Sequence, residues 1–202
     1  MVMVYSASVG LPDSPKFAYL EGRHEYFLYR QMAFIVAAIV AAWVTFRIPV
    51  AVLQKMAPLM FVGTLVLLML VLIPGVGVVV NGARRWLSLK VFNLQPSEMM
   101  KIVAVLYAAD FTVRKQQYMH KLTKGFMPMA FAIGVVGLLL LLEPDLGAFG
   151  VIVCIAMGIL FLGGFNARMF FLIALVLIGT FALIIAFDDL RRERILAYLD
   201  PW

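Results

Sequence analysis

Long apolar stretches constrain this chain more than any other feature. Residues 125–187 contain only three charged side chains, Glu143, Asp145 and Arg168. A helix that crosses a bilayer needs about 20 mostly apolar residues, so this stretch has room for three such helices. Over the whole chain 64% of the residues are hydrophobic and 14% are charged, against roughly 25% charged in a soluble domain. The sequence therefore predicts an integral membrane protein with several spanning helices.

The apolar runs predict the fold class, an all-α polytopic membrane helix bundle. The expected helices cover residues 26–46, 56–73, 96–113, 125–142, 146–167 and 169–187. The N-terminus is apolar but too short to span, and we interpret it as the end of a further helix, which makes seven. We interpret residues 75–93 as an ordered loop at the membrane surface. The chain is then one transmembrane domain, residues 1–202, cut at both ends.

The helix expected at residues 96–113 carries charge in its first turns. Glu98 and Lys101 are three residues apart, so they share one face of the helix. One interpretation is an ion pair at the interface, with Lys101 extending to water. The other is a polar cavity between helices, because charges within a membrane usually face the bundle interior and mark a site. The spacing alone leaves both interpretations open.

Other charged groups fall on the same side of the membrane when the helices alternate in direction. Arg84 and Arg85 are either headgroup anchors or site residues, and the cluster from Arg191 to Arg194 is either a solvated face or part of a site. For Glu143 and Asp145 we favour a tight turn that ends in water. Arginine and lysine suit an anionic headgroup such as a lipid diphosphate. The distribution of lysine and arginine does not settle the orientation in the membrane.

Two further residue types narrow the chemistry. A single cysteine, Cys154, excludes a disulfide within the chain. The two histidines, His24 and His120, are far apart and lack the spacing of metal ligands. We therefore expect no structural metal site.

Five short segments, in order along the chain, carry a family resemblance. They are YSAS (5–8), GARRW (82–86), QPSEMMK (95–101), EPDLG (143–147) and RILAYLDPW (194–202). With these segments the chain resembles the SEDS family of bacterial cell-wall synthesis (FtsW/RodA). The serine motif near the start and the ending DPW make it more similar to the division branch (FtsW) than to the elongation branch (RodA).

The resemblance implies a ten-helix fold, of which this chain would hold about seven. It implies a peptidoglycan glycosyltransferase that polymerises lipid II in the bacterial cytoplasmic membrane, at the division septum. The implied partners are lipid II, a class B penicillin-binding protein and other divisome membrane proteins, with no nucleic acid. The implied substrate-binding residues are Arg85, Glu98, Lys101, Asp145 and Arg194. A divalent metal, Mg²⁺ or Mn²⁺, is expected in the full-length enzyme, with its ligands unknown.

The resemblance also places the catalytic aspartate of the family in an outer loop after the seventh helix, beyond Trp202. We therefore expect no catalytic residue within this chain, and an inactive polypeptide when it is isolated. Two other functions stay open. One is a flippase for lipid II, although the inverted repeats of many transporters are not found. The other is a non-catalytic divisome scaffold, for which charge reversal at Glu98 or Lys101 would leave function intact.

Overall fold

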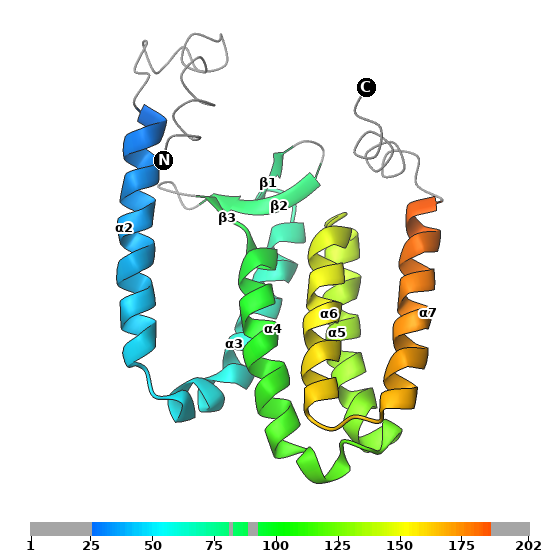
Figure 1. Ribbon diagram of the computed structural model, residues 1–202. Coiled ribbons are helices and arrows are strands. Elements are labelled where there is room, and N and C mark those ends of the chain that lie inside the picture. Colours follow the sequence, from blue (N-terminus) through cyan, green and yellow to red (C-terminus); the bar gives the residue numbers. More distant parts are fainter. Residues whose placement is uncertain (1–25, 81–82, 89–92, 187–202) are drawn as a thin grey trace, which may run out of the picture. The chain divides into compact units, whose positions relative to one another are not determined.

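The computed structural model describes residues 26–80, 83–88 and 93–186 (Figure 1). The chain forms two compact units, residues 1–52 and 53–202. Each unit is described by itself, and the single-domain organisation stays a prediction.

Six of the seven expected helices are present in the described part of the chain, and the N-terminal remnant lies outside it. The long helices are α2 (Tyr26–Arg47), α3 (Val50–Leu72), α4 (Pro96–Arg114), α5 (Met127–Leu142), α6 (Leu146–Leu162) and α7 (Ala167–Ala186). The all-α class is thus confirmed. The helix α3 begins six residues earlier than expected and keeps Pro58 inside it. The helix α6 ends five residues early, because Gly163 and Gly164 follow and Gly164 has a φ of +91°.

Four helical segments in the described part are long and apolar enough to cross a membrane, at 28–47, 50–72, 122–142 and 167–184. Helix α6 is apolar but shorter. Helix α4 is not among the four, in line with the charges in its sequence. Its burial makes the lower hydropathy tolerable, because Met100, Ala104 and Ala108 are fully buried within the bundle. A helix covered by protein needs less apolar surface than one that faces lipid.

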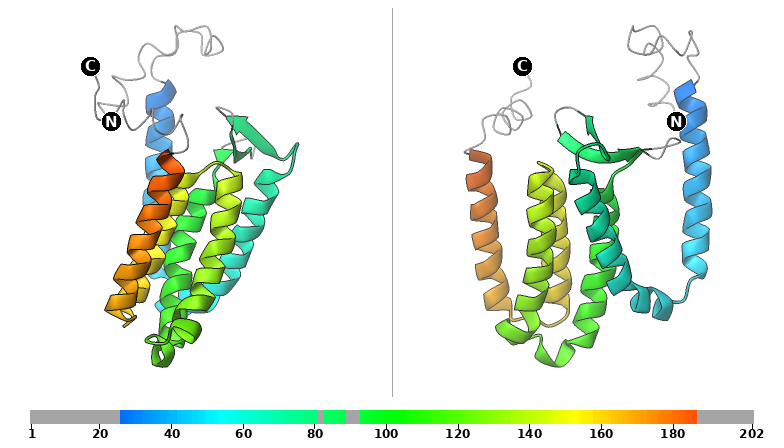
Figure 2. Two further views of the ribbon diagram at one scale, coloured as in Figure 1. Left: turned by 90° about the vertical axis from the view of Figure 1, so that its right-hand side faces the viewer. Right: turned by 180° about the vertical axis from the view of Figure 1, so that it is seen from behind.

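The core of the second unit is built around α4 and α6, which pack against each other along their lengths. Helix α6 also contacts α5 and α7, and Figure 2 shows these helices side by side. Helix α3 joins this core through Phe61, whose ring stacks on Tyr107 of α4 with centroids 4.2 Å apart. Between α5 and α6 there is no room for a side chain at Gly137, where a Cβ would collide with the ring of Phe149. Helices α5 and α6 are therefore closely packed at this point.

The stretch expected to be a surface loop contains a small antiparallel sheet in the order β1-β2-β3. The strands are β1 (Gly77–Val80), β2 (Ala83–Ser88) and β3 (Asn93–Leu94). The run of valines in β1 favours extended structure, because β-branched residues fit a pleated sheet. Strand β2 contacts α4, and its Leu87 is buried. The sheet lies at one end of the helices (Figure 1) and delivers a side chain of β2 to that end.

Candidate functional site

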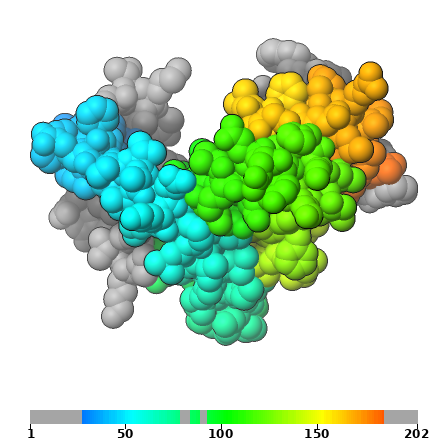
Figure 3. All heavy atoms as spheres, turned by 90° about the horizontal axis from the view of Figure 1, so that it is seen from below, coloured from blue at the N-terminus to red at the C-terminus, as the bar shows by residue number. Residues whose placement is uncertain are grey.

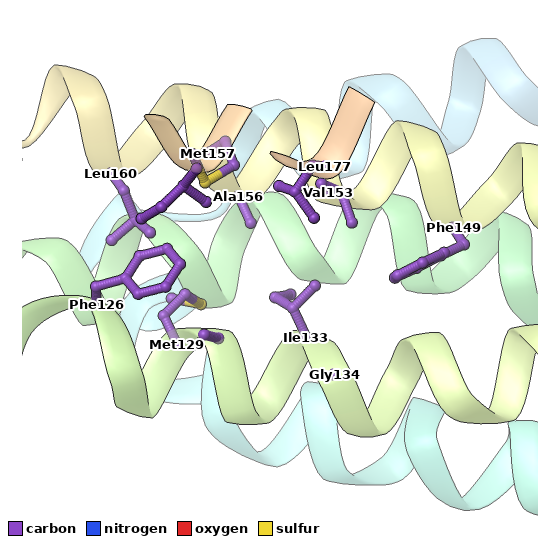
Figure 4. A pocket seen from close by; sticks show the side chains of 12 residues that line it. Phe126, Met129, Ile133, Gly134, Phe149, Val153, Ala156, Met157, Leu160 and Leu177 are labelled. Atoms are coloured by element: carbon purple, nitrogen blue, oxygen red, sulfur yellow. The ribbon is translucent and has the colours of Figure 1, made fainter. Parts of the chain in front are cut away.

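An apolar cavity of ≈ 160 Å³ lies among α5, α6 and α7 (Figure 4). It is lined by aliphatic, aromatic and methionine side chains and by small residues. A site that orients a charged ligand needs a few placed polar groups as well as apolar walls. This cavity offers none from its lining side chains. The candidate functional site is therefore sought where charged and polar side chains meet.

Such a meeting point is the turn between α5 and α6, where Asp145 joins α4 to α6. Its Oδ1 accepts a hydrogen bond from the backbone N–H of Ala148 at 3.2 Å, so Asp145 is the N-cap of α6. Its Oδ2 accepts from the Ser97 hydroxyl at 3.1 Å and from Gln95 Nε2 at 3.3 Å. Asp145 and Ser97 are both buried. One carboxylate thus fixes the start of α4 against the start of α6.

The start of α4 agrees in part with its sequence. Pro96 occupies the first turn, where its missing N–H costs no hydrogen bond. Gln95 occupies the N-cap position, but its side chain does not cap the helix. Instead Gln95 Nε2 donates to Ser97 Oγ at 2.9 Å and to Asp145. The side-chain amide of Gln95 therefore links the start of α4 to the start of α6 through Asp145.

Arg85 reaches the same turn from strand β2. Its Nε donates to the carbonyl oxygen of Glu143 at 3.0 Å, and its Nη2 donates to the carbonyl oxygen of Pro144. The last carbonyls of a helix lack partners within the helix and carry partial negative charge. The guanidinium therefore caps the C-terminal end of α5. Its neighbour Arg84 is exposed.

Glu98 and Lys101 pair with each other on the face of α4. The distance from Lys101 Nζ to Glu98 Oε1 is 2.7 Å, and the side chains are 26% exposed for Lys101 and 60% for Glu98. Glu98 lies in the first turn, where a negative charge is favourable to the helix dipole. The described residues thus leave the pair open at the surface. That it faces a substrate cavity stays a prediction.

Glu143 is the most unusual group at this turn. Its side chain is 0% exposed, and neither carboxylate oxygen has a hydrogen-bond partner among the residues that the structure describes. Burial, and to a smaller extent the negative charge of Asp145, raise the pKa of Glu143 from 4.5 to about 7, although the positive charge of Arg85 acts in the opposite direction. The expectation that this turn ends in water is wrong, because both Glu143 and Asp145 are buried. The sheet and the start of α4 pack on the turn, which its local sequence does not reveal.

The structure brings together two of the five predicted substrate-binding residues: Asp145 lies in the turn between α5 and α6, and Arg85 contacts that turn from β2. Glu98 lies next to Ser97, which donates to Asp145, so the ion pair of α4 adjoins this turn. Arg194 lies outside the described residues. Sequence reasoning missed Gln95 and Ser97 as partners of Asp145, although both belong to the QPSE segment.

A divalent metal would need more ligands than this turn supplies. No group of three histidine, cysteine, aspartate or glutamate side chains in the described ranges could share a metal ion. Both oxygens of Asp145 accept hydrogen bonds from protein donors. The described residues do not fit a metal centre by themselves, and we derive no step through a metal. The turn and the Glu98–Lys101 pair instead supply cations held near carboxylates: Arg85 near Glu143, and Lys101 beside Glu98.

These features define a class: a multi-pass membrane protein with a cluster of hydrogen-bonded polar side chains at one end of the helices. Comparison with known proteins gives the family. Residues 1–202 match the FtsW/RodA/SpoVE family of cell cycle proteins, and the chain belongs to this family.

Curated relatives support this assignment. One from Burkholderia thailandensis, named "Probable peptidoglycan glycosyltransferase FtsW", is 55% identical over 100% of this chain and 43% of its own length. One of the same name from Polynucleobacter necessarius is 49% identical over 100% of this chain and 47% of its own length. The chain spans about half the length of the curated relatives it matches.

Solved structures show the same fold. A chain from a study of a peptidoglycan synthase complex that coordinates polymerization and crosslinking is 28% identical, with a TM-score of 0.67. The match covers 100% of this chain and 58% of that one. The rod shape determining protein RodA of Thermus thermophilus is 25% identical, with a TM-score of 0.64 over 91% of this chain and 56% of that one. The SEDS resemblance of the sequence is thus confirmed.

Proposed function

We propose that this chain is the membrane core of a peptidoglycan glycosyltransferase that polymerises lipid II during septal wall synthesis. The observation that carries the proposal is the polar end of the bundle, where Arg85, Glu98, Lys101 and Asp145 stand in the segments that match the family. The names of the relatives, which describe those proteins, point the same way. A class B penicillin-binding protein would be its partner in the longer protein.

The chemistry follows from the substrate. The 4-hydroxyl of the acceptor sugar attacks the anomeric carbon of the donor, the new glycosidic bond forms, and the bond to the lipid diphosphate breaks. Inversion from an α-linked donor to a β-linked product fits a single displacement. Lys101 has three N–H donors, of which one meets Glu98, so others can meet the oxygens of the diphosphate. Such cations stabilise the negative charge that develops as the diphosphate leaves.

Other residues of the site would act by positioning. Arg85 holds the turn between α5 and α6, and Asp145 holds α4 to that turn. Together they would fix the depth at which Lys101 meets the substrate. The general base is expected outside residues 1–202, and a divalent metal in the longer protein would supply further charge neutralisation at the diphosphate.

A chimera tests the function without requiring the isolated chain to be active. Residues 1–202 replace the aligned segment of the Burkholderia thailandensis relative, and the purified chimera is given lipid II and a class B penicillin-binding protein. We expect glycan strands on a gel, because the replaced segment would carry the substrate-binding half. Transport of lipid II across vesicles without strands would favour the flippase. A chimera that supports division but neither transports nor polymerises would favour the scaffold.

A further inference from the structure

The connection between α4 and α5, residues 115–126, lies at the end of the bundle opposite to Glu98. It contains a short 3-10 helix (Gln116–Tyr118) and a turn of π-helix (Leu122–Phe126). The connection carries three lysines, Lys115, Lys121 and Lys124, and no acidic residue. The nearest acid in the sequence, Asp110, is buried and its Oδ2 accepts from Arg114 Nε at 2.7 Å. The charge of Asp110 is therefore neutralised by Arg114. Within the described ranges, no ion pair neutralises the three lysines.

Two of these lysines gather around one aromatic ring. The Nζ atom of Lys115 lies 6.0 Å from the ring centroid of Tyr118, and that of Lys124 lies 5.4 Å from it. An ammonium within about 6 Å of an aromatic centroid is attracted by the ring. Two like charges, which repel each other, thus lie near the same ring. An anion bound between them would relieve that repulsion.

The connection holds its shape through contacts with the core. Met119 is fully buried among the helices. Gly125 donates its backbone N–H to the carbonyl of Lys121 at 2.8 Å, and a Cβ at Gly125 would lie 2.6 Å from the carbonyl oxygen of Tyr118. The backbone of Tyr118 is thereby packed closely against Gly125. Figure 3 views the molecule from this end, with the connection in green at the surface.

An exposed apolar stripe on α5 begins three residues after Lys124. Met127 is 54% exposed and Phe131 is 77% exposed, and their spacing of four residues places them on one helix face. Leu138 continues the exposed apolar side farther along the helix. Along the chain, the lysines and Tyr118 are therefore followed directly by an exposed apolar track on α5. A phospholipid has this same order, an anionic headgroup followed by acyl chains.

We propose that residues 115–131 form a binding site for an anionic phospholipid. The phosphate binds between the ammonium groups of Lys115 and Lys124 over Tyr118, and an acyl chain lies along Met127 and Phe131. The site is independent of the proposed glycosyltransferase activity, because it lies at the far end of α4 from Glu98 and Lys101. It gives the chain a preferred lipid at this face of the membrane.

Electron spin resonance with spin-labelled lipids tests the site on residues 1–202 in phosphatidylcholine bilayers. The measured quantity is the preference of the protein for labelled phosphatidylglycerol over labelled phosphatidylcholine. We expect the Lys115→Gln/Lys124→Gln variant to lower this preference by roughly fivefold or more, from the attraction of each lysine to an anionic lipid. The matched control is Lys55→Gln, an exposed lysine on α3, which should keep the preference.

A second pair of variants isolates the contribution of the aromatic ring. Tyr118→Leu should lower the preference and Tyr118→Phe should retain it, because only the first removes the ring. An equal preference in wild type and in the double lysine variant would overturn the proposal. So would full loss of the preference on adding inorganic phosphate when the same ionic strength of chloride has no effect, because the site would then be one for free phosphate.

Discussion

We expect the Glu143→Gln variant to unfold at nearly the same temperature at about pH 5 and about pH 8, whereas the unchanged chain loses stability at the higher pH. In the folded protein the pKa of Glu143 is raised from 4.5 to about 7. The folded state therefore holds this proton more tightly than the unfolded state, and the stability falls as the pH rises from 4.5 to about 7. Above that range the loss is complete.

The size of the effect follows from the shift. One pKa unit corresponds to about 1.4 kcal/mol, so ionising Glu143 in the folded state costs roughly 3 kcal/mol. Glutamine has nearly the same shape and no charge, so the variant should be more stable than the unchanged chain by up to that amount at about pH 8. Thermal unfolding in detergent micelles, followed by tryptophan fluorescence, measures it.

Glu98→Gln is the matched control for this experiment, because Glu98 has the same chemistry but a side chain that is 60% exposed. It should leave the pH dependence unchanged. If the Glu143→Gln variant still lost as much stability between the two pH values as the unchanged chain, the claim that Glu143 is buried and unpaired would be wrong.

Asp145→Ala is expected to have an effect of similar size through a different cause. The change removes the N-cap of α6, leaves the buried Ser97 hydroxyl without its acceptor, and removes one of the two acceptors of the Gln95 amide. Hydrogen bonds to a charged acceptor contribute about 1.5–3 kcal/mol each, and a lost cap costs about 1 kcal/mol. Because such losses are not additive, we expect the free energy of unfolding to fall by about 3 kcal/mol.

A double-mutant cycle identifies the Ser97 contact as the link between the helices. Ser97→Ala, Asp145→Ala and the double variant are unfolded under the same conditions. We expect a coupling energy of about 1 kcal/mol or more between Ser97 and Asp145, as for side chains in direct contact. Independent, additive losses would show that the hydrogen bond between α4 and α6 does not form. Asp145→Asn keeps an acceptor for Ala148 and should be less damaging than Asp145→Ala.

The helices were predictable because their determinants are local. Apolar runs of spanning length and Pro96 mark most of their positions, whereas the end of α6 before the glycines at 163 and 164 was not predicted. The sheet at residues 77–94 was interpreted as a loop, although the valines of β1 carried a signal for strands. That signal was weak because the strands are short and the segment is also rich in glycine.

The site was predictable in its residues and less so in its contacts. Glu98 and Lys101 pair as their spacing indicates, since a helix fixes which residues share a face. Arg85 was expected to bind phosphate, yet its guanidinium contacts the carbonyls that end α5. The burial of Glu143 depends on what packs over its turn from elsewhere in the chain. Such long-range packing leaves no mark in the EPDLG segment itself.

The central claim is that the polar end of the bundle binds the substrate, and Lys101 tests it most directly. The measurement is the rate of lipid II polymerisation by the chimera carrying Lys101→Glu, beside the matched Lys55→Glu control. Our account predicts that Lys101→Glu lowers the rate by more than roughly tenfold, equivalent to about 1.4 kcal/mol, and that Lys55→Glu keeps it. A Lys101→Glu chimera that polymerised lipid II at the unchanged rate would contradict it.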